Sequence, residues 1–96
     1  MDYHIVYTQR ALGDLAEIIR YIAEDNREAA TRFGNSLLDH IEMLQRYPRM
    51  GSTIHERANV RRLVHSPIVV YYRVHEGENA VEILHLRHGS RQPPRF

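Results

Sequence analysis

Residues 60–88, which read VRRLVHSPIVVYYRVHEGENAVEILHLRH, decide the fold. Three runs rich in β-branched, aromatic and other apolar residues, at 60–64, 68–75 and 80–88, are separated by two short polar segments. These segments contain Ser, Pro, Gly and Asn, the residues that favour turns. The pattern predicts three consecutive antiparallel strands, with turns at 65–67 and 76–79.

Upstream of these strands the periodicity changes from that of a strand to that of a helix. Residues 2–8 alternate polar and apolar side chains, which predicts a strand. Residues 9–24 place their apolar side chains on one helical face, directly after Thr8, which is a suitable N-cap. Asp25, followed three residues later by Glu28, fits a capping box that closes this helix and opens a second one.

The second helix carries one apolar stripe and ends before Pro48. The stripe consists of Ala30, Phe33, Leu37, Ile41 and Leu44. Residues 49–59 show no periodicity and predict a loop. Two helices with one apolar stripe each must cover a further surface, so we expect an α+β fold in the order β-α-α-β-β-β. A helical hairpin would lie on one face of a mostly antiparallel sheet in a single domain, 1–96, with an extended tail at 89–96.

The lengths of the two turns predict which side chains share a face of the sheet. Turns of three and four residues put Val70 opposite both Arg62 and His85. The next position on that face would hold Val60, Tyr72 and Ile83, and the other face would hold Arg61, Tyr71 and Leu84. A slip of one residue in either turn would regroup them, so the register leaves open whether Arg61 or Arg62 meets solvent. Arg73 falls opposite Glu82, which predicts a cross-strand ion pair.

Charge divides the chain into two unlike halves, although the net charge is only +1. Residues 1–48 hold five arginines and eight acidic residues, whereas residues 49–96 hold eight arginines and four acidic residues. All 13 Lys and Arg residues are arginine, whose planar guanidinium suits phosphate or carboxylate partners. The basic C-terminal half therefore indicates an anionic partner, either an acidic protein or a nucleic acid.

The composition also excludes several classes of protein. The 43% of hydrophobic residues and 26% of charged residues are typical of a globular domain. The absence of cysteine excludes disulfides, thiol catalysis and thiolate metal sites. The sequence shows neither a secretory signal nor an apolar run long enough to span a membrane, so we expect a cytoplasmic protein.

Seven histidines suggest a metal site, but their spacing argues against one. His85 and His88 lie three residues apart on one expected strand, which sends their side chains to opposite faces. The sequence contains no nucleophile elbow and no glycine-rich phosphate loop, so we expect no metal and no cofactor. The remaining candidates are the arginines and histidines of the sheet, which can move protons and stabilise negative charge during RNA cleavage.

Four stretches are more specific than their periodicity. They are ALGDLAEIIRYIAED (11–25), AATRFGNSLLDHIEMLQRYPRMG (29–51), VRRLVHSPIVVYYRV (60–74) and VEILHLRHGSR (81–91). In this order they resemble the RelE/ParE superfamily of type II toxin–antitoxin toxins, over residues 5–91. The resemblance implies a toxin that acts inside bacteria and is neutralised by an acidic antitoxin encoded beside it.

The superfamily has two mechanistic branches. ParE-like members poison DNA gyrase without being enzymes, whereas RelE-like members cut mRNA in the ribosomal A site. Val64 stands where RelE-like members carry an arginine, the chain has no lysine, and it ends before their C-terminal tyrosine. The resemblance therefore favours a ParE-like gyrase inhibitor, with Arg61, Arg62 and Arg91 as target-binding residues.

Two alternatives remain open. A RelE-like ribosome-dependent endonuclease would be a metal-independent enzyme, with Arg62, His85, His88 and Arg91 as candidate catalytic residues. The other alternative is an inactive protein-interaction module. The expected partners are thus an acidic antitoxin together with gyrase, or alternatively the ribosome with mRNA, and no membrane.

Overall fold

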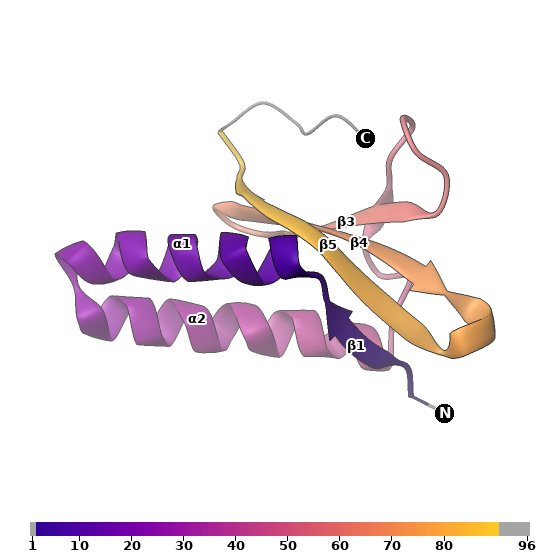
Figure 1. The fold of residues 1–96 in the computed structure, drawn as a ribbon, viewed down its shortest axis with the longest axis horizontal. Helices are drawn as coiled ribbons and strands as arrows, with labels where there is room; N and C mark the ends of the chain where they lie inside the picture. The colour runs from indigo at the N-terminus through magenta and orange to yellow at the C-terminus, as the bar shows by residue number, and fades with distance from the viewer. Residues whose placement is uncertain (1, 91–96) are drawn as a thin grey trace.

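The sheet has five strands in the spatial order β1-β5-β4-β3-β2. The computed structural model describes residues 2–90, which Figure 1 shows as a ribbon. The strands are β1 (His4–Tyr7), β2 (Ser52–Thr53), β3 (Val60–His65), β4 (Ile68–His75) and β5 (Ala80–His88). The three predicted consecutive strands are confirmed, and β1 joins β5 in parallel while all other pairs are antiparallel. The two-residue strand β2 lies in the segment expected to be a loop.

Two helices, α1 (Gln9–Asp25) and α2 (Arg27–Glu42), form the predicted hairpin. Thr8 caps α1 as expected, because its side chain accepts a hydrogen bond from the amide of Ala11. The capping box at Asp25 is wrong: Asn26 is the N-cap of α2, and its Oδ1 accepts from the amide of Ala29 at 3.0 Å. The side chain of Asn26, one residue later than expected, thus satisfies one of the free amide groups at the start of α2.

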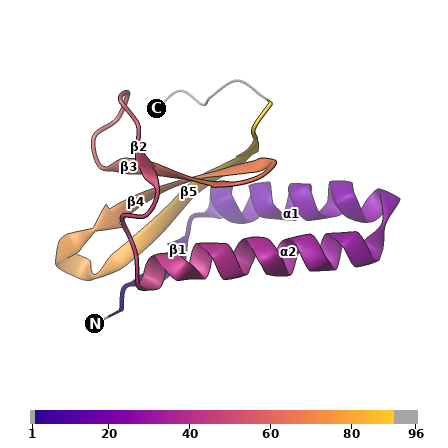
Figure 2. The ribbon, with the colours of Figure 1, turned by 180° about the vertical axis from the view of Figure 1, so that it is seen from behind.

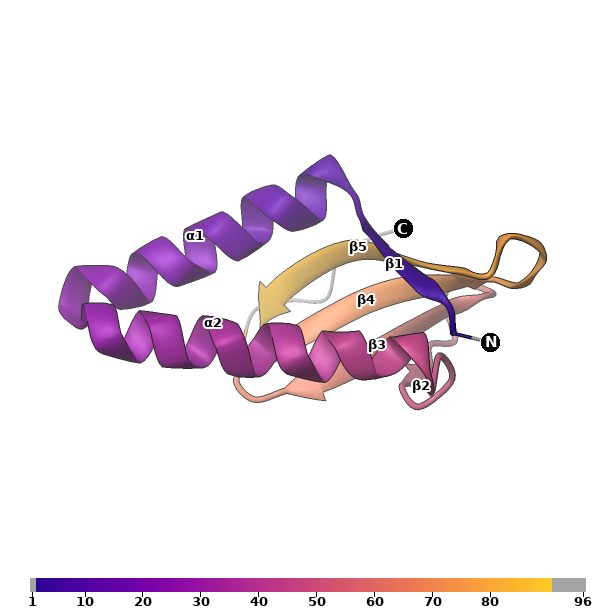
Figure 3. The same cartoon turned by 90° about the horizontal axis from the view of Figure 1, so that it is seen from below.

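The hairpin lies on one face of the sheet, and no helix of residues 2–90 covers the other face, which we call the open face (Figures 1 and 3). Figure 2 shows the molecule from behind, with β2 and β3 at the opposite edge of the sheet from β1. The helix-facing core consists of Ala11, Leu37, Ile41, Leu44, Leu63, Ile68, Val70, Tyr72, Val81, Ile83 and Leu86. A smaller cluster on the open face consists of Val60, Val69 and Tyr71, with Ile54 and Leu84 packed against it. The α+β architecture is the one that the sequence predicts.

The register differs from the prediction in two places. Only Ser66 and Pro67 separate β3 from β4, so Arg62 lies opposite Tyr71 and not opposite Val70. Between β4 and β5 a β-bulge gives Tyr71 the partner His85 and leaves Leu84 without one. The predicted common position of Val70, Arg62 and His85 is therefore wrong.

Beyond the bulge the predicted pairing of β4 with β5 is confirmed. Tyr72 lies opposite Ile83, and Arg73 lies opposite Glu82, with an N···O distance of 3.9 Å between their charged groups. Val60 does not join Tyr72, because the shorter turn places it opposite Arg73.

Hydrogen bonds at Gly51 connect the segment before β2 to the core. Its amide donates to the Tyr72 hydroxyl at 2.9 Å, and burial raises the pKa of that hydroxyl. The Arg61 guanidinium donates to the carbonyl of Gly51 at 2.9 Å and to that of Arg49 at 3.3 Å. These hydrogen bonds fix the position of residues 49–51, which lie in a segment whose sequence shows no periodicity.

A pair of histidines connects α2 to the end of β3. Nδ1 of His40 and Nδ1 of His65 are 2.8 Å apart, so only one proton can lie between them. The Ser36 hydroxyl lies 3.2 Å from Nε2 of His65, and the Phe33 ring meets the His65 ring edge-on. Desolvation, together with the charge of His40, lowers the pKa of His65 from its ordinary value of 6.5.

We expect the free energy of unfolding to decrease as the pH falls below about 6.5, where the unfolded chain binds a proton at residue 65 that the folded chain resists. His65→Gln should remove this part of the pH dependence, measured by urea denaturation between about pH 7.5 and pH 5.5. His55→Gln is the control, because His55 is exposed. An unchanged pH profile in His65→Gln would contradict the expectation.

Candidate functional site

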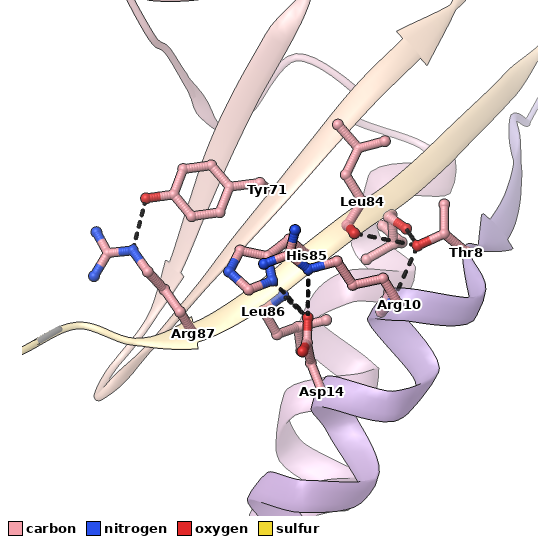
Figure 4. Close-up of polar contacts among 10 residues, drawn as sticks. Thr8, Arg10, Asp14, Tyr71, Leu84, His85, Leu86 and Arg87 are labelled. Atoms are coloured by element: carbon pink, nitrogen blue, oxygen red, sulfur yellow. Dashed lines mark hydrogen bonds and ion pairs between the residues drawn. The ribbon is translucent and has the colours of Figure 1, made fainter. Parts of the chain in front are cut away.

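Three side chains of the basic half meet on the open face of the sheet. Arg62 of β3, Tyr71 of β4 and His85 of β5 lie opposite one another across the strands. Arg87, two residues after His85, lies beside them, and Figure 4 shows the contacts of Tyr71, His85 and Arg87. We call Arg62, Tyr71, His85 and Arg87 the Tyr71 row.

The β-bulge sets the position of His85. Because Leu84 has no partner on β4, His85 comes to lie beside Tyr71, with ring centroids 6.0 Å apart and planes inclined by 15°. Asp14 reaches the same imidazole from α1: its Oδ2 lies 2.6 Å from Nδ1 of His85 and accepts from the amide of Leu86 at 3.1 Å (Figure 4). The open face and the helical hairpin are therefore joined at His85.

Arg87 contacts the Tyr71 side chain as well. Its Nε donates to the Tyr71 hydroxyl at 2.9 Å, and its guanidinium carbon lies 5.6 Å from the centre of the Tyr71 ring. The same guanidinium donates to the carbonyls of His88 and Gly89. Arg87 therefore combines a cation–π contact with hydrogen bonds that fix the end of β5.

The structure separates the two adjacent arginines expected to bind a target. Arg62 is exposed on the open face, and within residues 2–90 its guanidinium has no hydrogen-bond or ion-pair partner. Arg61 points to the helix side, where it binds the carbonyls of Arg49 and Gly51. The geometry thus answers the question that the sequence left open: Arg62 meets solvent.

The other expected site residues are not gathered at one place. His85 belongs to the Tyr71 row, whereas His88 lies opposite Ile68 on the helix side, which confirms the prediction of opposite faces. Nδ1 of His88 lies 2.7 Å from the Ser90 hydroxyl. Arg91 lies outside the described residues, and its role stays a prediction.

The sequence analysis missed Asp14, Tyr71 and Arg87 as parts of this site. The signal for Asp14 was present, because it lies three residues after Ala11 and four before Ile18, inside the apolar stripe of α1. A carboxylate at such a position needs a polar partner. Tyr71 gave no comparable signal, because only the bulge brings it to His85. Arg87 was missed although it lies two residues after His85, on the same face of β5.

Val64 is the apolar neighbour of Arg62 on the open face. It pairs with Val69 and is 56% exposed. Arg62 is therefore flanked by apolar surface and not by a second cation at that position. In the part of the chain from 2 to 90, no cluster of three or more His, Asp or Glu side chains could hold a metal ion, and no helix is long and apolar enough to cross a membrane.

Comparison with known proteins identifies the class. A family model described as "ParE toxin of type II toxin-antitoxin system, parDE" matches residues 5–93. The chain is also 36% identical over 88 residues to Toxin RelE2 of Caulobacter vibrioides, covering 91% of this chain and 96% of that protein. The chain is a type II toxin. It belongs to the ParE toxin family within the RelE/ParE superfamily.

Solved structures show the same fold. The chromosomal ParDE system of P. aeruginosa matches with a TM-score of 0.74 at 22% identity, covering 90% of this chain and 95% of that chain. The RelBE2 toxin–antitoxin complex of Mycobacterium tuberculosis matches with a TM-score of 0.72 at 19% identity, covering 92% of each chain. The isolated E. coli RelE toxin matches with a TM-score of 0.64 at 16% identity, covering 94% of this chain and 87% of that chain.

Proposed function

We propose that this toxin acts as ParE-like toxins do, arresting growth by binding and inhibiting DNA gyrase without cleaving RNA. The match to the ParE family model supports the proposal. The observation that carries it is the surroundings of Arg62, an exposed arginine without a partner in residues 2–90, beside Val64, which is 56% exposed. An arginine set in apolar surface is typical of protein–protein interfaces, where Arg and apolar side chains are enriched.

Supercoiling of relaxed plasmid tests this proposal directly. We expect stoichiometric toxin to inhibit gyrase, while primer extension on ribosome-bound mRNA in a parallel reaction shows no toxin-dependent cuts. Toxin premixed with its antitoxin is the control. Cleavage in the A site with unaffected gyrase would reverse the assignment, and growth without arrest on expression would favour an inactive interaction module.

A second candidate function, RelE-like mRNA cleavage, is favoured by one contact. The Asp14 carboxylate lies 2.6 Å from Nδ1 of His85, as in sites where a carboxylate orients a histidine that accepts a proton. Arg62 and Arg87 could balance the charge on a phosphate nearby. The primer-extension arm of the same experiment decides between the two functions.

We also propose that a cognate acidic antitoxin neutralises this toxin. Similar solved proteins include the RelBE2 and RelBE toxin–antitoxin complexes, and the C-terminal half of this chain carries eight arginines against four acidic residues. Fast association should weaken as salt is added, while buried apolar contacts keep the complex together. We expect co-expressed toxin and antitoxin to elute as one peak from a sizing column at physiological salt. Two separate peaks would contradict the proposal.

A further inference from the structure

We infer that Asp14 is a positioning residue for His85, and that it makes Nε2 of this histidine a hydrogen-bond acceptor for the target. The inference rests on the proposed function in one respect, namely that the open face of the sheet meets the target. The donor that fits this acceptor is a hydroxyl or an N–H group of the bound target.

The place of Asp14 follows from the short first strand. β1 pairs with β5 only from His4 opposite Ala80 to Tyr7 opposite Ile83, so no strand of residues 2–90 pairs with the second half of β5 on that side. Oδ2 of Asp14 accepts from the Leu86 amide at 3.1 Å and so replaces the missing strand at that position. This bond anchors the carboxylate at the edge of the sheet independently of His85.

The anchored carboxylate decides which imidazole nitrogen carries the proton. The same Oδ2 lies 2.6 Å from Nδ1 of His85, and a carboxylate that receives a backbone N–H acts as an acceptor. Nδ1 must then be the donor, and a neutral ring has its lone pair on Nε2. Nε of Arg10 lies 4.0 Å from the same oxygen, at the outer limit of an ion pair.

Nε2 is left available at the surface. Within residues 2–90 it has no hydrogen-bond partner, and no buried polar side-chain atom there lacks one, so Nε2 is reached by solvent. The rest of the ring is held in place, because the His85 side chain is only 12% exposed and Tyr71 stacks against it. An acceptor fixed in this way loses little conformational entropy when it binds a donor.

Nitrogen NMR of purified ¹⁵N-labelled toxin tests the positioning step without any target. We expect the neutral His85 of the parent protein to carry its proton on Nδ1. Asp14→Asn, which keeps an accepting oxygen, should preserve this tautomer, whereas Asp14→Ala should lose it. A parent protein with the proton on Nε2, or an Asp14→Ala variant with an unchanged spectrum, would overturn the inference.

Growth arrest on induced expression tests the link to the target. We expect Asp14→Ala and His85→Ala each to weaken arrest by about tenfold or more, the loss produced when a buried donor of the target is left without its acceptor. The double variant should be no weaker than His85→Ala, because the two residues act through one acceptor. Asp14→Asn should restore much of the effect, and Glu17→Ala, which removes an exposed carboxylate about one turn further along α1, should arrest growth like the parent.

The controls separate two kinds of failure. If folded Asp14→Ala and His85→Ala arrest growth as strongly as the parent, the inference is overturned even where the NMR result is as expected. If they lose arrest but gyrase is unaffected by the parent toxin, the inference stands and the proposed gyrase target fails. Thermal melting of each variant shows that a loss of arrest does not reflect unfolding.

Discussion

Arg62→Ala is expected to remove most of the growth arrest while the protein melts near the parent temperature. The side chain is exposed and has no partner within residues 2–90, so its loss should change the free energy of unfolding by no more than about 0.5 kcal/mol. An arginine that anchors a target interface typically contributes about 2 kcal/mol or more of binding. Colony counts after induction, compared with the melting curve, measure the two effects separately.

Two other arginines serve as controls for Arg62. Arg57→Ala removes an exposed arginine from the loop before β3 and should leave both arrest and stability unchanged. Arg61→Ala should instead destabilise the fold, because the Gly51 and Arg49 carbonyls lose their donor. Full growth arrest in a folded Arg62→Ala variant would remove Arg62 from the target-binding residues. Arg91→Ala carries the same expectation as Arg62→Ala.

Gly51→Ala is expected to be the most destabilising of the substitutions considered. A Cβ atom at this position would lie 2.5 Å from the carbonyl oxygen of Arg62 and 2.7 Å from the Tyr72 hydroxyl. Neither atom can move easily, since one belongs to the sheet backbone and the other to a fully buried side chain. We expect a loss of roughly 2–4 kcal/mol, within the range of overpacked cores combined with a lost buried hydrogen bond. Thermal or urea denaturation measures it.

Gly13→Ala is the matched control for Gly51→Ala. A Cβ at Gly13 meets no atom within 4 Å, and the residue lies in the interior of α1. Alanine there should stabilise the protein by roughly 0.5–1 kcal/mol through helix propensity. If both variants melted like the parent, the close approach at Gly51 would not limit stability.

The local signals in the sequence predicted both α-helices and, within residues 2–90, every strand except β2. Apolar periodicity and the Thr8 cap are properties of neighbouring residues, so they can be read without knowing the fold. The two-residue strand β2 was missed because its pairing with Arg61 and Arg62 depends on the Gly51 and Tyr72 contact. No periodicity within 49–59 could have indicated it.

The register around Tyr71 could not be predicted, and the candidate site depends on it. Because the turn has two residues and not three, Arg62 lies opposite Tyr71 and not opposite Val70. Because of the bulge, His85 also lies opposite Tyr71. Each shift is a single residue, which exchanges the two faces of a strand. Asp14 was missed for a related reason, because its partner lies 71 residues away and becomes visible only when the sheet is assembled.

The close approach at Gly51 also has a consequence for genetic screens. Gly51 donates its amide to the Tyr72 hydroxyl, and a Cβ here would meet both that hydroxyl and the carbonyl oxygen of Arg62, so Gly51 links the buried interior to the strand that bears the exposed arginine. A search for non-toxic survivors would therefore return substitutions at Tyr72 and Gly51 beside those at Arg62. The substitutions at Tyr72 and Gly51 would identify residues that support the position of Arg62 and do not bind the target. Second-site substitutions that restore toxicity to them should therefore arise in the packing around Tyr72 and not on the open face.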